Sequence, residues 1–377
     1  DERERMYKSA LINDPNDIEA AILLACVYRD TNRRSAAREL IDEWIKQENT
    51  LTIPERGHLR EVLAELQFLG NDFASAWPNY HWRFKWREMS NWYPSQPEWQ
   101  GEPLENKTIL VSSEQGVGDQ VMFSALLPVL QACGAHVILE SDPRLVPLFL
   151  RSFPEITCVP AENPPNQTAL SSCIDFYVAM GSIGCQLWSR FKACPPKPYL
   201  RADPIKVEEL KAGYKRSTKE RIVGISWKSP RGKRGPVKSI SLTDLVPIFR
   251  KPDIRFVNLQ YGETALEIGD LERDFGVHVV QDINVDQDSD LDTYAAQLAA
   301  MDIIITVSNS TAHLAGALGV QTFVLLPATP QWKWGGSGEQ SEWYSHVVLR
   351  RHEGGKSLQQ QIRRIATDIA ADADKEN

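Results

Sequence analysis

The feature that most constrains the fold is a series of short β-branched runs, each followed by a helical pattern. The series begins with KTILVSS, HVILE and ITCVP, between residues 107 and 160. It restarts with RIVGISW at residue 221 and continues through IRFVNLQ, VHVVQ, DIIITV and QTFVLL. Strands that alternate with helices pair in parallel, so the pattern predicts two α/β lobes, each with a parallel sheet. We expect these lobes at 107–205 and 206–377, with a hinge within 201–220.

Residues 1–90 differ, because their apolar residues recur at helical spacing and they contain no strand-like run. Small residues lie where paired helices would cross, and Ala37 and Ala76 occupy similar positions 39 residues apart. The segment resembles tetratricopeptide repeats, whose period is about 34 residues, and an unrelated bundle of helical hairpins is the alternative. Prolines at 94, 97 and 103 then predict a linker over 91–106.

The charge balance argues against a nucleic-acid partner. The chain has 42 basic and 50 acidic side chains and a net charge of -8, so as a whole it repels a phosphate backbone. Its six cysteines include no CxxC pair, which indicates neither a zinc knuckle nor a redox pair and suits a reducing cytoplasm. No apolar run reaches the roughly eighteen residues of a transmembrane helix. We therefore expect a cytoplasmic protein without a transmembrane segment.

The first candidate site follows the run KTILVSS and reads EQGVGDQVMF. Gly116 and Gly118 let the backbone turn tightly and approach a ligand at the start of a helix, whose first N–H groups are unsatisfied. A dinucleotide fingerprint would need a third glycine where Val121 stands, so a nicotinamide enzyme is disfavoured and no cofactor is expected. Asp119 lies at the helix start, where a carboxylate serves either as a backbone cap or as a general base.

The second candidate site is the strand, loop and helix DIIITVSNSTAHLAGALG, residues 302–319. Hydroxyl and amide side chains crowd the helix entry, where the helix dipole stabilises an anion by about 0.5–1 kcal/mol. A diphosphate suits such an entry. His313, one turn into the helix, either donates to a phosphate or bonds a neighbouring carbonyl. The predicted donor-binding residues of this site are Ser308, Asn309, Ser310, Thr311 and His313.

The third candidate site is the basic loop WKSPRGKRGPVKSISL, residues 227–242. Loops at the carboxyl ends of parallel strands line the ligand crevice, so cations there can offset the charge of a leaving group. Gln260, which ends IRFVNLQ, is expected in the same layer, near a base or ribose. Among the five basic side chains we expect contacts from Lys228 and Lys238, and a solvated role for Arg231, Lys233 and Arg234.

With these three loops in place, the chain resembles the heptosyltransferase-like glycosyltransferases of family 9, in the subgroup that carries tetratricopeptide repeats. The resemblance covers nearly the whole chain. It rests on EQGVGDQVMFSALLPVL, on VGISW followed by KSISL, on TVSNSTAHLAGALGVQTFVLLP, and on WKWG and WY near Trp332 and Trp343. It implies a GT-B fold, in which two Rossmann-like lobes enclose the active site. Asn309 departs from the family, where aspartate is usual. Lys238 stands where an arginine is frequent, and a lysine keeps the charge but cannot bind a phosphate in a bidentate manner.

The resemblance implies a bacterial enzyme that moves a sugar from a nucleotide-sugar donor to an acceptor hydroxyl, without a metal and with inversion. Asp119 would deprotonate the acceptor, and Ser310, Thr311 and His313 would hold the donor diphosphate. The repeats favour a protein or peptide acceptor, and a cell-surface glycan is the alternative. The acidic run at 282–292 lacks the glycine and spacing of a calcium loop, so we expect a solvated surface turn.

Two other functions stay open at this point. In the first, the lobes have lost catalysis and the protein is a repeat-based binding or scaffold module, for which Asn309 is a hint. In the second, the same two-lobe cleft serves a nucleotide-sugar epimerase, because a shared fold does not fix the reaction.

Overall fold

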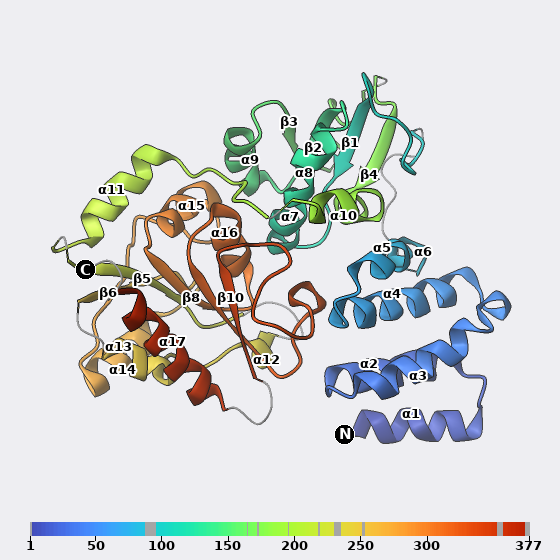
Figure 1. Cartoon of the computed structure of the whole chain (residues 1–377), viewed down its shortest axis with the longest axis horizontal. Helices are drawn as coiled ribbons and strands as arrows, with labels where there is room; N and C mark the ends of the chain where they lie inside the picture. Colours follow the sequence, from blue (N-terminus) through green and yellow to red (C-terminus); the bar gives the residue numbers. More distant parts are fainter. Residues whose placement is uncertain are drawn as a thin grey trace. The chain divides into compact units, whose positions relative to one another are not determined.

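The computed structural model describes residues 2–86, 96–163, 165–171, 173–194, 196–217, 219–229, 235–250, 253–352 and 357–373 (Figure 1). The chain forms two compact units, which we describe separately. The helical unit comprises Asp1–Glu102, Gly181–Cys194 and Ala328–Gly338, and the α/β unit comprises Pro103–Met180, Pro195–Pro327 and Glu339–Asn377. None of the described helices combines the length and the apolar character needed to cross a lipid bilayer.

Paired helices build the helical unit. Helices α2 and α3 form one hairpin and α4 and α5 another, and the turns of both pass through an asparagine, Asn32 or Asn71, at φ 61°. Asparagine adopts this left-handed conformation more readily than most residues. The two turns have the same spacing as Ala37 and Ala76, so the hairpins repeat. The helices are α1 (Glu2–Asn13), α2 (Ile18–Asp30), α3 (Arg34–Ile45), α4 (Ile53–Leu69), α5 (Phe73–His81), α6 (Arg83–Trp86) and α10 (Gly184–Lys192).

An aromatic cluster forms the core where α10 and the segment 328–338 join these helices. The ring of Trp77 lies 4.9 Å from Phe68 and 5.5 Å from Trp188, and Phe68 stacks on Trp332 at 4.3 Å. Gly184 allows the close approach, because a Cβ there would lie 2.5 Å from the Trp77 ring. The sequence-based division assigned both added segments to the lobes. Repeated helical hairpins are therefore observed, while their identification as tetratricopeptide repeats stays a prediction.

The α/β unit contains two separate parallel sheets, which define a first and a second lobe. The first sheet has the order β3-β2-β1-β4, and every neighbouring pair is parallel. Its strands are β1 (Thr108–Ser112), β2 (His136–Ser141), β3 (Thr157–Pro160) and β4 (Phe176–Ala179). The helices of the first lobe are α7 (Val117–Phe123), α8 (Leu127–Gln131) and α9 (Val146–Ser152).

The second sheet has the order β10-β9-β8-β5-β6-β7 and is also parallel throughout. Numbered within the lobe, this is the 3-2-1-4-5-6 order of doubly wound nucleotide-binding sheets. Its strands are β5 (Arg221–Ser226), β6 (Ile254–Asn258), β7 (Val279–Val280), β8 (Ile303–Val307), β9 (Thr322–Leu326) and β10 (Val347–Arg351). The helices of the second lobe are α11 (Pro204–Tyr214), α12 (Gly235–Lys238), α13 (Val246–Phe249), α14 (Ala265–Phe275), α15 (Leu291–Ala299), α16 (Ser310–Leu318) and α17 (Leu358–Ala373). The predicted fold class, a two-lobed α/β protein preceded by helices, is confirmed.

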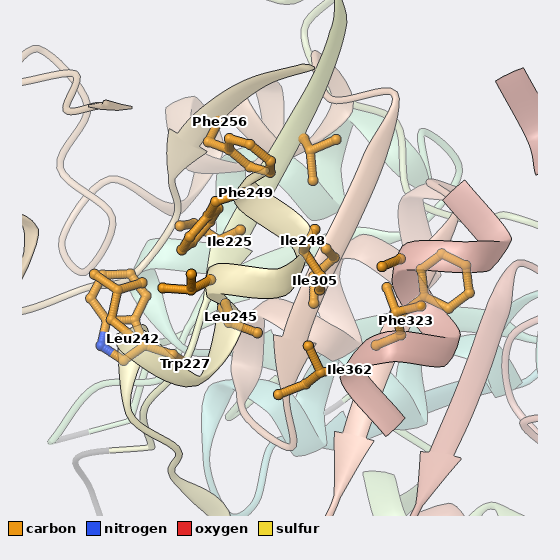
Figure 2. Close-up of a cluster of buried hydrophobic side chains, with 14 of the residues drawn as sticks. Ile225, Trp227, Leu242, Leu245, Ile248, Phe249, Phe256, Ile305, Phe323 and Ile362 are labelled. Atoms are coloured by element: carbon orange, nitrogen blue, oxygen red, sulfur yellow. The ribbon is translucent and has the colours of Figure 1, made fainter. Parts of the chain in front are cut away.

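Helices cover both faces of the second sheet, with α15 and α16 on one face and α13, α14 and α17 on the other (Figure 1). Figure 2 shows the core on the α13 side, where Ile225, Phe249 and Phe256 belong to the same buried cluster as Trp227 and Leu242. Ile362 of α17 belongs to the same buried cluster. Burial of a large apolar side chain contributes about 1.5–3 kcal/mol, so this cluster fixes the sheet whose strand ends carry the candidate site.

Three elements differ from the sequence expectation. Strands β4 and β10 were not expected, because the runs FYVA and VVLRR are short and border polar residues. The expected hinge at 201–220 contains helix α11, which Asp203 caps by accepting from the backbone N–H of Ile205 at 2.9 Å. We also observe that α17 packs into the core of the second lobe.

Candidate functional site

The strand order places one loop of each lobe where a ligand crevice forms. In the first sheet, β1 lies between β2 and β4, and in the second sheet, β5 lies between β6 and β8. At such a switch point the connections leave toward opposite sides, and ligands bind beyond the carboxyl ends of the strands. The loop after β1 carries Gly116 and leads to Gly118 in the first turn of α7. The loop after β5 carries Lys228, and the loop after β8 carries Ser308 and Asn309 and leads to Ser310 and Thr311 at the start of α16. The first, second and third candidate sites therefore all follow strands at switch points.

Helix α7 of the first lobe lies against the N-terminus of α16 in the second, which we call the α7–α16 contact. A Cβ at Gly118 would lie 3.0 Å from Cδ2 of His313 and 3.5 Å from Cα of Ser310. A Cβ at Gly116 would lie 3.8 Å from Oδ2 of Asp119. Glycine at 118 thus permits a close approach of two helices, and it brings the first and second candidate sites together.

Asp119 is in the first turn of α7, where its N–H donates to the carbonyl of Gly116 at 2.9 Å. Gly116 itself occupies the N-cap position, so Asp119 is not the cap residue. The Asp119 side chain is half-buried. The pKa of Tyr344 is well above its usual value, first because the side chain is buried and then because of Tyr199. The charge of the Asp119 carboxylate raises this pKa further. The carboxylate therefore lies within electrostatic reach of Tyr344, whose ring packs on α16.

Asn309 caps α16 and joins it to the end of β5. Its Oδ1 accepts from the N–H of Ala312 at 3.3 Å and from the hydroxyl of Thr306 at 3.1 Å. Its Nδ2 donates to the hydroxyl oxygen of Ser226 at 2.8 Å and to the carbonyl of Lys228 at 3.0 Å. A carbonyl only accepts, so this position uses the N–H of an amide, which aspartate lacks. The hydrogen bond to the Lys228 carbonyl is therefore a structural reason for asparagine rather than aspartate at position 309.

The polar residues of the α16 entry differ in exposure. Ser308 and Thr311 are buried, and Ser310 is half-exposed. Tyr294 donates to the carbonyl of Leu259 at 2.8 Å, so the Thr311 hydroxyl, 2.7 Å away, donates to Tyr294. The hydroxyl of Thr311 therefore supports the loop from inside. Ser310 is the hydroxyl of this entry that is placed for a ligand, together with the backbone N–H groups of the first turn.

His313 is buried and bonds a tyrosine that the sequence analysis did not assign to the site. Its Nδ1 lies 2.9 Å from the hydroxyl of Tyr344. The Tyr344 ring packs flat on α16 at Gly316, where a Cβ would lie 2.6 Å from Cγ of the ring. Tyr344 is also hydrogen-bonded to Tyr199, whose hydroxyl donates to the carbonyl of Val121 at 2.8 Å. The WY pair and the small residues of α16 were the only sequence signals for this arrangement.

The basic loop is described only in part, since Arg231, Lys233 and Arg234 lie outside the described residues. Lys228 is half-buried, and its Nζ lies 2.6 Å from Oε1 of Glu267 in α14. The other carboxylate oxygen of Glu267 accepts from Nε1 of Trp227 at 3.0 Å. Lys238 ends α12 and is half-buried. Glu267, which the sequence analysis missed, therefore competes with any phosphate for Lys228.

Gln260 has a different position from the one expected. Its side chain is buried, and its Oε1 accepts from the hydroxyl of Ser226 at 3.1 Å and from the N–H groups of Trp227 and Lys228 at 3.0 and 2.7 Å. Its Nε2 donates to the carbonyl of Tyr261 at 3.0 Å. These bonds hold the exit of β5 in place. We therefore assign Gln260 to the support of the loop and not to a base or ribose.

A second contact between the lobes involves the acidic run, and we call it the ionic contact. Arg151 of α9 donates to both carboxylate oxygens of Asp292 in α15, at 2.5 and 2.8 Å. Arg144 donates to the carbonyl and carboxylate of Asp288 at 2.9 and 3.3 Å. The run expected as a solvated turn thus bonds the first lobe through two of its aspartates.

A pocket of about 520 Å³ lies elsewhere on the second lobe, between α11, α15 and the loop after β7. Leu210, Val285 and the exposed Ile283 give it an apolar part, and Lys206 and Asp282 are polar members of its wall. None of the predicted site residues lines this pocket.

Comparison with known proteins gives the following. No protein-family model matches the chain. The chain is 32% identical over 263 residues to Protein FlbA of Caulobacter vibrioides. The matched region covers 66% of this chain and 44% of FlbA, so this chain spans less than half of that relative. Among solved structures, it is similar to E. coli ADP-heptose lps heptosyltransferase II, at 15% identity and a TM-score of 0.47, covering 71% of this chain and 99% of that one. It is also similar to a family 9 glycosyltransferase from Veillonella parvula, at 12% identity and a TM-score of 0.47, covering 73% and 99%.

Proposed function

We propose that this protein is a glycosyltransferase that moves a sugar from a nucleotide-sugar donor to an acceptor hydroxyl. The observation that carries the proposal is the approach of Gly118 to Ser310 and His313. It joins a turn bearing a carboxylate, Asp119, to a helix N-terminus bearing a hydroxyl, at the switch points of two parallel sheets. A base and an anion site side by side are what a sugar transfer from a diphosphate requires.

In this proposal the donor diphosphate binds at the start of α16. The first N–H groups of a helix lack intrahelical partners, and the helix dipole favours an anion by about 0.5–1 kcal/mol. The half-exposed hydroxyl of Ser310 adds a donor. Lys228 and Lys238 offset the charge of the leaving group, and Lys228 exchanges its bond with Glu267 for one with phosphate. Gly116 and Gly118 keep the backbone close to the ligand.

Asp119 acts as the general base. It accepts the proton of the acceptor hydroxyl while that oxygen bonds the anomeric carbon, and the bond from this carbon to the diphosphate oxygen breaks. The nucleoside diphosphate leaves with the bonding electron pair, and a single displacement inverts the anomeric configuration. We propose that this reaction needs neither a metal ion nor a cofactor. A well-placed base accelerates such a step by roughly 100- to 10,000-fold.

The acceptor in this proposal is a protein or peptide, with a cell-surface glycan as the alternative. Repeated helical hairpins, of which the described residues contain two, form surfaces that bind extended peptides in other repeat proteins. The net charge of -8 disfavours a nucleic acid. We propose a cytoplasmic location, in agreement with the cysteine usage.

A binding screen followed by a turnover assay tests the proposal. Thermal unfolding with ADP-, GDP-, UDP- and dTDP-linked sugars should show a higher melting temperature with one nucleotide, because a ligand of the folded state stabilises it. With that donor, Asp119→Asn should retain binding and lose transfer. Glu155→Gln, an exposed carboxylate of the first lobe, is the matched control.

Three outcomes would contradict the proposal. Binding without any turnover of the donor by the wild type would support a scaffold module. Release of an epimerised sugar in the absence of an acceptor would support an epimerase. Equal transfer by Asp119→Asn and the wild type would remove Asp119 from the role of base.

A further inference from the structure

The backbone of Lys228 is fixed beside the entry of α16, while its side chain turns to another helix. Its N–H donates to Oε1 of Gln260 at 2.7 Å, and its carbonyl accepts from Nδ2 of Asn309, which caps α16, at 3.0 Å. Its ammonium lies 2.6 Å from Oε1 of Glu267 in α14. Because the stem of a lysine is long and flexible, the ammonium can leave Glu267 without a movement of the backbone.

Glu267 does not depend on Lys228 for its position. Its other oxygen, Oε2, accepts from Nε1 of Trp227 at 3.0 Å, and the Trp227 ring is fully buried in the cluster of Figure 2. Glu267 also lies in the first turn of α14, where the helix dipole favours a carboxylate. When Lys228 leaves, the carboxylate keeps both of these stabilising interactions. It therefore remains in place to bond the ammonium again.

The ion pair between Lys228 and Glu267 is also weak enough to be exchanged. The two side chains are 35% and 36% exposed, so water and salt screen their attraction. A phosphate that takes the ammonium must compete with Glu267, and a pair of this exposure lowers the affinity for the phosphate by about fivefold at most. After sugar transfer, the same competition acts against the nucleoside diphosphate, which must leave before a new donor binds.

We propose that Glu267 is a positioning residue that competes with the diphosphate for Lys228 and thereby promotes release of the nucleoside diphosphate product. The inference rests on the proposed function for the identity of this product. In the free protein, Lys228 is bonded to Glu267. In the complex the ammonium bonds the diphosphate, and on release it returns to Glu267, which Trp227 has kept in place.

Calorimetry with inorganic pyrophosphate, on the full chain at about 0.15 M salt, tests the competition. Glu267→Gln keeps an oxygen for the Trp227 indole and removes the charge that attracts Lys228, so pyrophosphate should bind about fivefold more tightly than to the wild type. In a Lys228→Met background the same change should have little effect, because the ammonium is absent. Glu272→Gln removes an exposed charge from the same helix and should leave the affinity unchanged.

Product inhibition supplies a second readout, which a purely structural role of Glu267 would not change. With the donor found in the screen, the nucleoside diphosphate should inhibit Glu267→Gln at about fivefold lower concentration than the wild type, because it dissociates more slowly. Thermal melting of each variant checks that the fold is intact.

Two results would overturn this inference alone. One is an affinity of Glu267→Gln for pyrophosphate that equals that of the wild type or falls below it. The other is an equal gain in the Lys228→Met background, which would show that the carboxylate acts on the ligand through its charge and not through Lys228. Because pyrophosphate binding needs no sugar transfer, the expected gain without any transfer would contradict the glycosyltransferase and leave the exchange of Lys228 standing. Absence of pyrophosphate binding by every variant would overturn both.

Discussion

Two of the contacts that the described residues make between the lobes of the α/β unit have opposite character. The α7–α16 contact is closely packed at Gly118 and borders the buried side chains of His313 and Tyr344. The ionic contact joins Arg151 and Arg144 to Asp292 and Asp288 through side chains that are partly exposed. Buried packing tolerates no added atom, whereas exposed ion pairs are screened by water and salt. We infer that the first contact sets the geometry of the site and that the second contributes little to it.

The largest effect should come from Gly316→Ala, which crowds the buried Tyr344 ring next to the α7–α16 contact. The added methyl would lie 2.6 Å from Cγ of the buried Tyr344 ring, and Cγ is at the base of that side chain, so the helix or the whole ring must shift. Overpacking of this kind costs about 1–3 kcal/mol, and we expect a loss near 3 kcal/mol. Chemical denaturation monitored by tryptophan fluorescence measures it. An unchanged midpoint would show that the contact is loosely packed.

Asn309→Asp should have the next largest effect. The aspartate would place an oxygen against the carbonyl of Lys228, which the Asn309 amide now bonds at 3.0 Å. A buried acceptor left without a donor costs about 1–3 kcal/mol, partly offset by the favourable helix dipole. Thermal melting at pH 7.5 checks the expected loss of about 2 kcal/mol. Asp17→Asn, at the partly buried cap of α2, provides the control and should change little, because both residues cap helices well.

Gly118→Ala should lower the affinity for the donor more than it lowers the stability of the fold. Its Cβ would lie 3.0 Å from Cδ2 of His313, so the ring or α7 must shift by a few tenths of an ångström. We expect a stability loss of about 1 kcal/mol and a tenfold weaker affinity for the donor nucleotide, measured by calorimetry. Gly269→Ala in α14 is the matched control, since nothing lies within 4 Å of its Cβ. Alanine there should stabilise the helix by about 0.5–1 kcal/mol and leave donor affinity unchanged.

Arg151→Gln, in the ionic contact, should have the smallest effect. Partly exposed ion pairs contribute about 0–1 kcal/mol and weaken with salt, so the melting temperature should fall slightly at low salt and match the wild type near 1 M salt. Donor affinity should not change. A loss of stability that persists at high salt would contradict this expectation, because it would show that the ionic contact also stabilises the protein by packing.

The sequence predicted the fold more completely than the site, and the difference has a physical basis. Strand runs such as DIIITV are long, apolar and buried on both faces, so a strand can be recognised from the residues of the run alone. Strand β10 was missed because VVLRR ends in two arginines, which the fold buries. The region 201–220 was expected as a hinge, although Asp203 before Pro204 also fits a helix start.

Site residues depend on which side chains lie near one another, and a single chain gives little of this. Gly118, Ser310 and His313 were assigned to the site from motifs, and the structure brings them together. Thr311 and Gln260 lie near the site but point into the protein, where their bonds support the loops. Tyr199 was missed because it lies between the lobes in a segment without periodicity. It is hydrogen-bonded to Tyr344, which is far away in the sequence and close only in the folded chain.

In the proposed function, the α7 turn and the α16 entry form one nucleotide-sugar site. A crystal structure of the chain with the nucleotide found in the binding screen tests it most directly. We expect a diphosphate bonded to the hydroxyl of Ser310 and the first N–H groups of α16, with the Asp119 carboxylate directed at the position of the sugar. A nucleotide bound in the pocket between α11 and α15, with the α16 entry covered by side chains, would contradict it.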